Sequence, residues 1–267
     1  MKYIRKFSTP EDREAYMAST PAPDMPYMHL VESTGAVKFS SPEVDYPLYI
    51  KALGNLTVKF GNTYEYSKDN VTWTSATSST SISATKGERV FFRASGLTAS
   101  SSSGIGSFNI SNGDCNVGCN VMSMVYGADF KGKTEITQTY QFYRLFYSSS
   151  STGGRIVDAS GLALPATTLA NDCYSYMFYD CSSLVNAPAL PATTLTQYCY
   201  SNMFRGCTKL NYIKAMFTTT PSSTYTSNWV NGVSPTGTFV KNSAATWTDT
   251  FGVDAIPEGW TVETADA

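Results

Sequence analysis

The chain has 267 residues, of which 42% are hydrophobic and 15% charged, and its 19 Lys and Arg against 21 Asp and Glu give a net charge of -2. This balance provides no broad positive field for a phosphate backbone or an anionic lipid surface, so we expect no nucleic-acid partner. No apolar run reaches the roughly 18 to 20 residues of a membrane span, so we expect no membrane insertion. Because Ser, Thr, Asn and Tyr take the place of charged residues, the surface is expected to be polar and uncharged.

Residues 1–44 predict a small α+β module. Thr9 and Pro10, followed by two carboxylates, form a strong helix start, and the helix is expected to run to about Met17. The sequence YMHLVESTGAVKFS then predicts two strands around a turn at 33–35. No apolar segment follows the first basic residues, so we expect no secretory signal. Because so short a module rarely buries its own core, we expect it to attach to another protein.

Residues 45–125 predict a β-sandwich-like domain. Short alternating runs such as LTVKF, VTWTS, RVFFRA and GSFNIS recur every 8 to 12 residues or so, between clusters rich in Asn and Gly. This spacing is typical of antiparallel sheets. The run CNVGC, with Cys115 and Cys119, is interpreted as a strand or a bulge of this domain and not as a pair of metal ligands.

Residues 126–214 contain a sequence repeat. LPATTLANDCYSYMFYDCSS begins at Leu164 and LPATTLTQYCYSNMFRGCTK at Leu190, and twelve of the aligned positions are identical. The period of 26 residues lies within the roughly 20 to 29 of leucine-rich repeats, in which each unit buries its apolar face on the next. The predicted repeat core consists of Leu169, Cys173, Met177, Phe178, Cys181 and Leu184 in one copy and Leu195, Cys199, Met203, Phe204, Cys207 and Leu210 in the other.

Each repeat unit is predicted to hold a strand, a turn and a short helix. Asn171 or Asp172 is a suitable helix cap, and Cys173, Met177 and Cys181 at i, i+4 and i+8 would share one stripe of that helix. A degenerate earlier copy is recognised when 145–146 is aligned with 177–178, and 156–157 with 184–185, with an insertion around Gly153. Three units meet the minimum for a stable stack.

Residues 215–267 predict a terminal cap. The period is lost there, and Trp229, Trp247 and Trp260 are expected to cover the last apolar face. The predicted fold is therefore mixed and mainly β, with the N-terminal α+β module, the sandwich-like domain, a short leucine-rich-repeat solenoid and its C-terminal cap.

The repeat motif and the segments KAMFTTTP, GTFVKNSAATW and IPEGWTV that follow it resemble the BspA-like leucine-rich repeats of gut Bacteroides and their phages, over roughly residues 45–267. The resemblance implies a non-enzymatic virion structural protein, similar to the appendages or head fibres of crAss-like phages. Such a protein would be made in the bacterial cytoplasm and displayed on the virion surface as a capsid- or tail-attached fibre or decoration. Residues 1–44 would bind other virion proteins, and a homo-oligomer is expected. The alternative is a BspA-like adhesin of the bacterial cell surface.

Candidate chemistry is sparse. His29 is the only histidine, no catalytic motif accompanies it, and of Asp158, Asp172 and Asp180 the last two are replaced in the next unit, so we expect no enzyme. Six cysteines allow a metal cluster, disulfides or core packing, but CxxC pairs are absent and four of the six lie on the predicted inward stripe. We therefore expect no metal and no cofactor. As a hypothesis, Cys173 with Cys199 and Cys181 with Cys207 could oxidise outside the cell.

Tyrosines supply the candidate binding surface. Tyr174 and Tyr200 are shared between the copies and are expected to pack, whereas Tyr176, Tyr179 and Tyr198 occupy variable positions and are expected to face solvent. Exposed rings on an uncharged hydroxyl- and amide-rich face suit a host-surface or mucosal glycan, and suit a protein partner equally well. Ordinary surface tyrosines are the remaining alternative.

Overall fold

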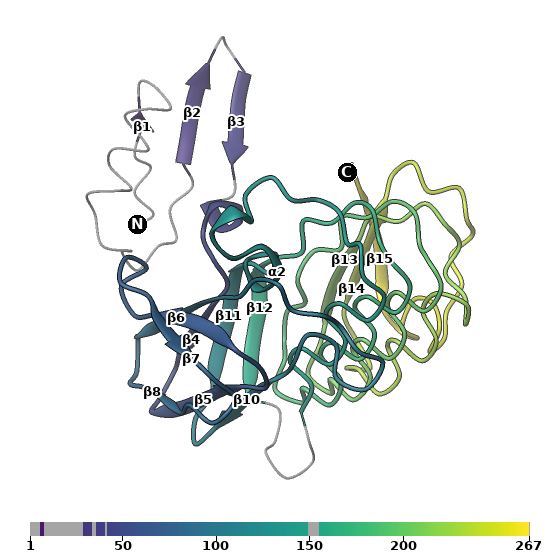
Figure 1. The fold of residues 1–267 in the computed structure, drawn as a ribbon. Coiled ribbons are helices and arrows are strands. Elements are labelled where there is room, and N and C mark those ends of the chain that lie inside the picture. Colours follow the sequence, from purple (N-terminus) through teal and green to yellow (C-terminus); the bar gives the residue numbers. More distant parts are fainter. Residues whose placement is uncertain (1–5, 8–28, 34–35, 41, 149–154, 267) are drawn as a thin grey trace.

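The protein is described by a computed structural model that covers residues 6–7, 29–33, 36–40, 42–148 and 155–266. Among the described residues the fold is mainly β, with several separate sheets (Figure 1). In the N-terminal module, β2 (His29–Ser33) and β3 (Ala36–Ser40) form the predicted antiparallel pair, and β1 (Lys6–Phe7) adds a parallel edge to β2. The helix predicted between Thr9 and Met17 lies outside the described residues.

Two sheets pack against each other in the region predicted to be sandwich-like. One has the strand order β12-β11-β4-β9-β6-β7 and the other β10-β5-β8. Their bounds are β4 (Tyr49–Ala52), β5 (Leu56–Phe60), β6 (Tyr64–Ser67), β7 (Thr74–Ala76), β8 (Ile82–Ala84), β9 (Arg89–Arg93), β10 (Phe108–Ser111), β11 (Cys115–Asn120) and β12 (Ile156–Ala163). The rings of Phe92 and Phe108 meet between the sheets with centroids 4.9 Å apart, and Phe60 lies 4.7 Å from Phe108.

Only short helical segments are found among the described residues. They are the 3-10 turn η1 (Pro42–Asp45), the single-turn helix α2 (Ser123–Tyr126) and the 3-10 turn η2 (Gly127–Asp129). None of the described helices is long and apolar enough to cross a membrane.

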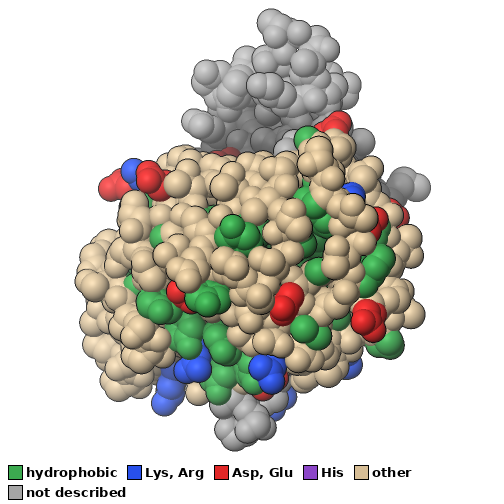
Figure 2. Space-filling view, turned by 90° about the vertical axis from the view of Figure 1, so that its right-hand side faces the viewer, with side chains coloured by type: hydrophobic (Ala, Val, Ile, Leu, Met, Phe, Trp, Pro, Cys, Tyr) green, Lys and Arg blue, Asp and Glu red, His purple; other side chains and the backbone are tan. Residues whose placement is uncertain are grey.

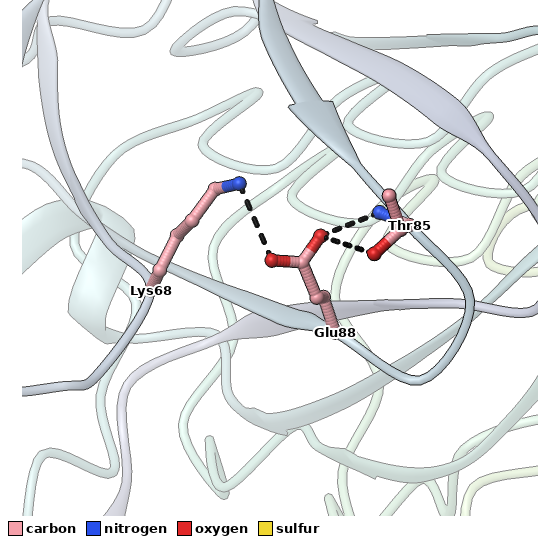
Figure 3. A network of polar contacts seen from close by, with 3 residues as sticks. All are labelled: Lys68, Thr85 and Glu88. Carbon is pink, nitrogen blue, oxygen red and sulfur yellow. Dashed lines mark hydrogen bonds and ion pairs between the residues drawn. The ribbon is translucent and has the colours of Figure 1, made fainter.

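Local chemistry fixes the turn between β8 and β9. The backbone N–H and the hydroxyl of Thr85 both donate to Oε2 of Glu88, at 2.5 and 2.8 Å, and Lys68 Nζ donates to Oε1 at 3.4 Å (Figure 3). Gly87 supplies the positive φ of 90° that the turn requires. A carboxylate that accepts from a turn amide ties the two strands together at their connection.

The CNVGC sequence is confirmed as strand β11. It pairs antiparallel with β4 and parallel with β12, with register shifts that follow Cys115 and Asn116. Cys119 adopts a positive φ of 65°, which is unusual for a residue other than glycine and marks the irregularity of this strand.

Beyond β12, the repeated segments lie side by side with parallel backbones. Asp158 bridges to Asn186, Asn186 to Tyr212, and the pairing continues through Thr238 to Thr261. The last three positions belong to β13 (Tyr212–Ala215), β14 (Thr238–Asn242) and β15 (Thr261–Ala265), which form a parallel sheet. One row of backbone pairing therefore runs from the first sheet through the repeats (Figure 1).

The helix predicted in each repeat unit is wrong. Residues 171–180 and 197–206 form successive turns, and every second amide donates to the carbonyl three residues earlier, as from Ser175 N to Asp172 O at 3.1 Å. The intervening amides donate to the next copy, as from Tyr174 N to Cys199 O at 3.0 Å. Because half of the amides bond to a neighbouring segment, an α-helix, which uses its amides internally, does not form. We call each such segment a turn ribbon.

The turn ribbon explains why the predicted stripe is nevertheless buried. Positive φ values recur every fourth residue, at Asp172, Tyr176 and Asp180, so the backbone repeats every four residues and not every 3.6. Residues at i, i+4 and i+8 then superimpose along the ribbon. All twelve predicted repeat-core side chains are buried, and the most exposed of them, Leu169, has 7% of its surface accessible.

Aromatic rings continue from one unit to the next. Phe108, Phe146 and Phe178 stack at 5.4 and 5.3 Å, and Phe204 and Trp229 extend the column at 5.8 and 6.1 Å. One core cluster therefore passes through the boundary predicted at residue 125. The repeats and the preceding sheets therefore share one hydrophobic core.

The alignment of the degenerate first copy is confirmed. Phe146 N donates to Met177 O at 2.9 Å, and Asp158 bridges to Asn186, as the alignment of 145–146 and 156–157 requires. The stretch from Phe146 to Asp158 is four residues longer than its counterpart from Phe178 to Asn186, in agreement with an insertion.

After Ala215 the sequence period fades, but the backbone period does not. Tyr212 pairs with Thr238 one period later, and Gly206 N donates to Asn231 O at 2.8 Å, so the turn ribbons also continue. The expectation that the period ends at this point is therefore wrong for the backbone. Backbone pairing needs only the spacing, so side chains there are free to change.

The three tryptophans of the C-terminal region are buried, with 0 to 7% of their surface accessible. Trp229 Nε1 donates to Ala255 O and Trp260 Nε1 donates to Ser234 O, both at 2.7 Å and both across one period. The indole donors thus join successive segments as well as filling the space between them.

Candidate binding surface

The outer face of the turn ribbons carries the predicted tyrosines. Tyr176 and Tyr179 come from the ribbon at 171–180, are half-buried, and lie with their ring centroids 5.3 Å apart. Tyr176 is at one of the positive-φ corners, with φ of 58°. The structure therefore brings these two predicted site residues together.

The preceding ribbon, at 139–146, and the residue after it supply further rings. Tyr143 lies 5.5 Å from Tyr176, Tyr147 lies 5.9 Å from Tyr179, and Tyr140 lies 5.6 Å from Tyr143. These contacts form because adjacent ribbons are hydrogen-bonded in register, for example from Arg144 N to Ser175 O at 3.2 Å.

Two arginines are inserted among the rings. The guanidinium carbon of Arg144 lies 5.0, 5.3 and 5.4 Å from the ring centroids of Tyr143, Tyr147 and Tyr176, and that of Arg205 lies 5.8 Å from Tyr179. These are cation–π distances. We call the group of Tyr140, Tyr143, Arg144, Tyr147, Tyr176, Tyr179 and Arg205 the tyrosine–arginine patch.

Tyr198, the third predicted site residue, stands apart from the patch. It is 40% exposed, and no ring or cation–π contact joins it to the patch in the described part of the chain. A neighbouring tyrosine is missing there because Asn202 takes the place of Tyr176 in the next copy.

Two carboxylates border the patch. Burial raises the pKa of both Asp172 and Asp180, and the nearby Arg205 opposes that rise at Asp180. Burial also raises the pKa of the Tyr143 hydroxyl, so that it remains a neutral hydrogen-bond donor over a wider pH range.

The surface around the repeats is mostly polar and uncharged. Figure 2 shows few charged side chains on the face seen from the side of the repeats, and hydrophobic side chains gather beside Lys and Arg near its lower edge. Such a face offers aromatic ring surfaces and hydroxyl or amide hydrogen bonds to a ligand, but no extended electrostatic field of one sign.

Five members of the patch were not predicted from the sequence, but the repeat alignment held a signal for two of them. With 145–146 placed on 177–178, Arg144 falls on Tyr176 and Tyr147 falls on Tyr179. Variable positions in adjacent copies become neighbours, so the same argument that selected Tyr176 and Tyr179 also applies to the earlier copy.

The six cysteines are buried free thiols. Burial raises the pKa of Cys115 and of Cys199 to about 12. Among the described residues, no group of three or more His, Cys, Asp or Glu is arranged to hold a metal ion. The disulfides suggested for Cys173 with Cys199, and for Cys181 with Cys207, stay a prediction about oxidising conditions.

Two of the residues considered for catalysis, His29 and Asp158, are not members of the patch. His29 belongs to β2, and its side chain lies outside the described part of the structure. Asp158 accepts a hydrogen bond from Ser160 N at 2.8 Å, which is a local contact within β12. Comparison of this chain with protein-family models, with curated proteins and with solved structures finds no match.

Proposed function

We propose that this chain is a non-enzymatic binding protein and that the tyrosine–arginine patch is its ligand surface. The observation that carries the proposal is that identical and variable positions of the repeats differ in where their side chains lie. Within the turn ribbons, the positions that are identical between copies, such as Cys173 and Met177, are buried, whereas several variable positions of adjacent ribbons meet on the outer face as a group of rings and guanidinium groups. Aromatic faces with hydroxyl groups around them suit the rings of a host-surface or mucosal glycan, or a protein partner.

We further propose that the side-by-side units are a leucine-rich-repeat solenoid of the BspA-like kind. The support is the offset of one period in backbone and side-chain contacts, such as the bonds from Ser175 Oγ to Ser201 O and from Thr196 Oγ1 to Ala170 O. In such a stack each unit contacts chiefly its neighbours, and a binding face grows by adding units.

For the biological setting, we propose a virion structural protein of a phage, displayed on the virion as a capsid- or tail-attached fibre or decoration. The resemblance of the repeats to BspA-like proteins of Bacteroides phages supports this setting, with residues 1–44 attaching the protein to other virion proteins and a homo-oligomer as the assembled form. A BspA-like adhesin of the bacterial cell surface is the second candidate, because the same repeats occur there.

The binding proposal is tested by adsorption of the purified chain to host cells. The double substitution Tyr176→Ser with Tyr179→Ser should reduce adsorption about tenfold or more, because each ring is worth on the order of 1 kcal/mol in a contact of this kind. Tyr212→Ser is the matched control, since Tyr212 is an exposed tyrosine (38%) outside the patch. Equal adsorption of the double variant and the control would contradict the proposal.

The setting is tested by peptide mass spectrometry of density-purified phage particles beside the washed envelope of the uninfected host. Recovery at stoichiometric level in the particles alone supports the virion assignment. Recovery in the host envelope alone replaces it with the adhesin.

A further inference from the structure

A pocket of about 300 Å³ opens where the first turn ribbon meets β10. Arg144 and Tyr147, both members of the patch, line it, so the pocket and the patch are continuous. Its opposite wall comes from Phe108, Asn109 and Ile110 of β10. The volume is at the lower end of the about 300 to 1,000 Å³ of ligand pockets, which leaves room for one small group and not for an extended chain.

The lining of this pocket is cationic and rich in hydroxyl groups. Arg144 and Arg155 contribute two guanidinium groups, and Ser102, Ser103 and Ser107 are among the serines around them. Among the described residues, no Asp or Glu lines the pocket. Guanidinium and hydroxyl donors around a small cavity are the groups that recognise a carboxylate or a sulfate.

One hydrogen-bond donor of Arg144, its Nε, is available to a ligand. Its Nε is buried and has no hydrogen-bond partner within the described structure, although three tyrosine rings surround the guanidinium group. A buried donor without a partner is costly, and an incoming acceptor that pairs with it recovers that cost. The arginine is thus held in place by the rings before a ligand arrives.

Arg155 forms a long, exposed ion pair with Asp114. Its Nη1 lies 3.7 Å from Oδ1 of Asp114, and the two side chains are 39% and 51% exposed. Ion pairs of this kind between exposed groups contribute little to stability, so an anionic ligand competes with Asp114 at small cost.

We propose that this pocket binds the anionic group of an acidic sugar, a carboxylate or a sulfate ester, while the rings of the patch hold adjoining sugar units. This proposal rests on the binding function proposed above and names its ligand class. Arg144 and Arg155 pair with the anion, and the serine hydroxyls bond to the sugar around it. Because the net charge of the chain is -2, selectivity for an anion at this place comes from the local arrangement and not from the overall field.

The experiment is calorimetric titration of the full-length chain at neutral pH with three trimers: galacturonic acid, galactose and sulfated galactose. At least one of the two acidic trimers should bind at least about tenfold more tightly than the galactose trimer, as expected for a charge-assisted hydrogen bond. Tighter binding of one acidic trimer identifies the carboxylate or the sulfate as the preferred group. Raising the salt concentration to about 1 M should reduce this preference, because the Debye length falls to about 3 Å.

Two variants and one control make the test specific. Arg155→Gln, at a half-exposed position, should remove most of the preference for the acidic trimer and leave binding of galactose unchanged. Arg144→Asn should also remove most of the preference for the acidic trimer, and because Arg144 contacts three rings of the patch, it should weaken binding of galactose as well. Asparagine tolerates the positive φ of 57° at this position. Lys133→Gln is the control, because it also removes a cation near a tyrosine ring, 5.1 Å from Tyr126, but lies outside the pocket and the patch.

Several results would overturn the acidic-sugar proposal. If galactose binds as tightly as the acidic trimers, the pocket is not selective, while glycan binding by the patch stands. If Lys133→Gln weakens acidic binding as much as Arg155→Gln does, the effect is one of overall charge. If no trimer binds, the proposal fails, and the adsorption assay with Tyr176 and Tyr179 decides separately whether the patch binds anything.

Discussion

The Sγ of Cys207 donates a hydrogen bond to the carbonyl oxygen of Phe178 at 3.1 Å, across the boundary between two repeat units. Cys181 makes the same bond to Phe146 O, also at 3.1 Å, one unit earlier. The repeated cysteines therefore bond to the backbone of the preceding unit in addition to filling the core. A small residue with a donor suits this place, in agreement with the recurrence of cysteine there.

Removal of the Cys207 thiol should destabilise the stack. Cys207→Ala loses the sulfur and its hydrogen bond, and leaves Phe178 O without this partner, so the free energy of unfolding should fall by about 1–2 kcal/mol. Cys207→Ser keeps a donor and should lose less. Urea unfolding of the three proteins, followed by tyrosine and tryptophan fluorescence, checks the order. Equal loss in both variants would mean that volume, and not the hydrogen bond, decides.

The thiols should be unreactive in the folded protein. Because burial raises the pKa of Cys115 and of Cys199 to about 12, little thiolate is present at pH values below that. Alkylation in native buffer should therefore be slow, and all six cysteines should react promptly in denaturant. Mass spectrometry of the alkylated chain counts the labels. Rapid native labelling would show that the units open, and the same assay after air oxidation, with and without reduction, tests the pairing of Cys173 with Cys199.

The positive φ of Tyr176 predicts which substitutions its turn tolerates. Tyr176→Asn and Tyr176→Val both lose the ring contacts, but valine is β-branched and disfavours a φ of 58°, whereas asparagine is found with φ of 53° at Asn202 in the next copy. Tyr176→Val should be less stable than Tyr176→Asn by about 1–2 kcal/mol. Thermal unfolding of the two variants gives the comparison. Equal midpoints would contradict the left-handed turn at this position.

The Glu88 turn should make a pH-dependent contribution to stability. The hydrogen bond from Thr85 N lowers the pKa of Glu88 below its ordinary value of 4.5. Since the folded-state pKa is the lower one, the contribution is present above about pH 4.5 and is lost as the pH falls through the folded-state pKa. Glu88→Gln should therefore cost about 1 kcal/mol or less at neutral pH, because the site is solvent-screened, and nothing in strong acid. Urea unfolding at the two pH values measures this, and an equal cost at both would contradict the ionic role.

Predictions made from one sequence were most accurate where the interaction is repeated. Leu169 and Leu195 recur one period apart, and a residue that recurs in step while its neighbours vary is selected by a repeated environment, here the core. The residues of the candidate site could be predicted from the sequence only in part. Tyr176 and Tyr179 were selected because they vary, but Tyr143 and Arg205 join them only because separate ribbons lie in register.

The helix prediction failed for a physical reason that a local sequence does not contain. Cys173, Met177 and Cys181 match the spacing of a helix stripe, and they match a four-residue turn period equally well. What separates the two structures is the destination of the amides at Tyr174 and Tyr176, which donate to carbonyls of the next copy at 3.0 and 2.9 Å. Those acceptors exist only after the copies have come together.

The sequence by itself determined the period of 26, the residues of the repeat core and the mainly β character of the preceding region, because these depend on which side chains avoid water. Tertiary structure alone decided the backbone form of each unit, the continuation of the period beyond Ala215, and the grouping of rings around Arg144. These features depend on hydrogen bonds and ring contacts between segments one period or more apart, and no local pattern specifies such partners.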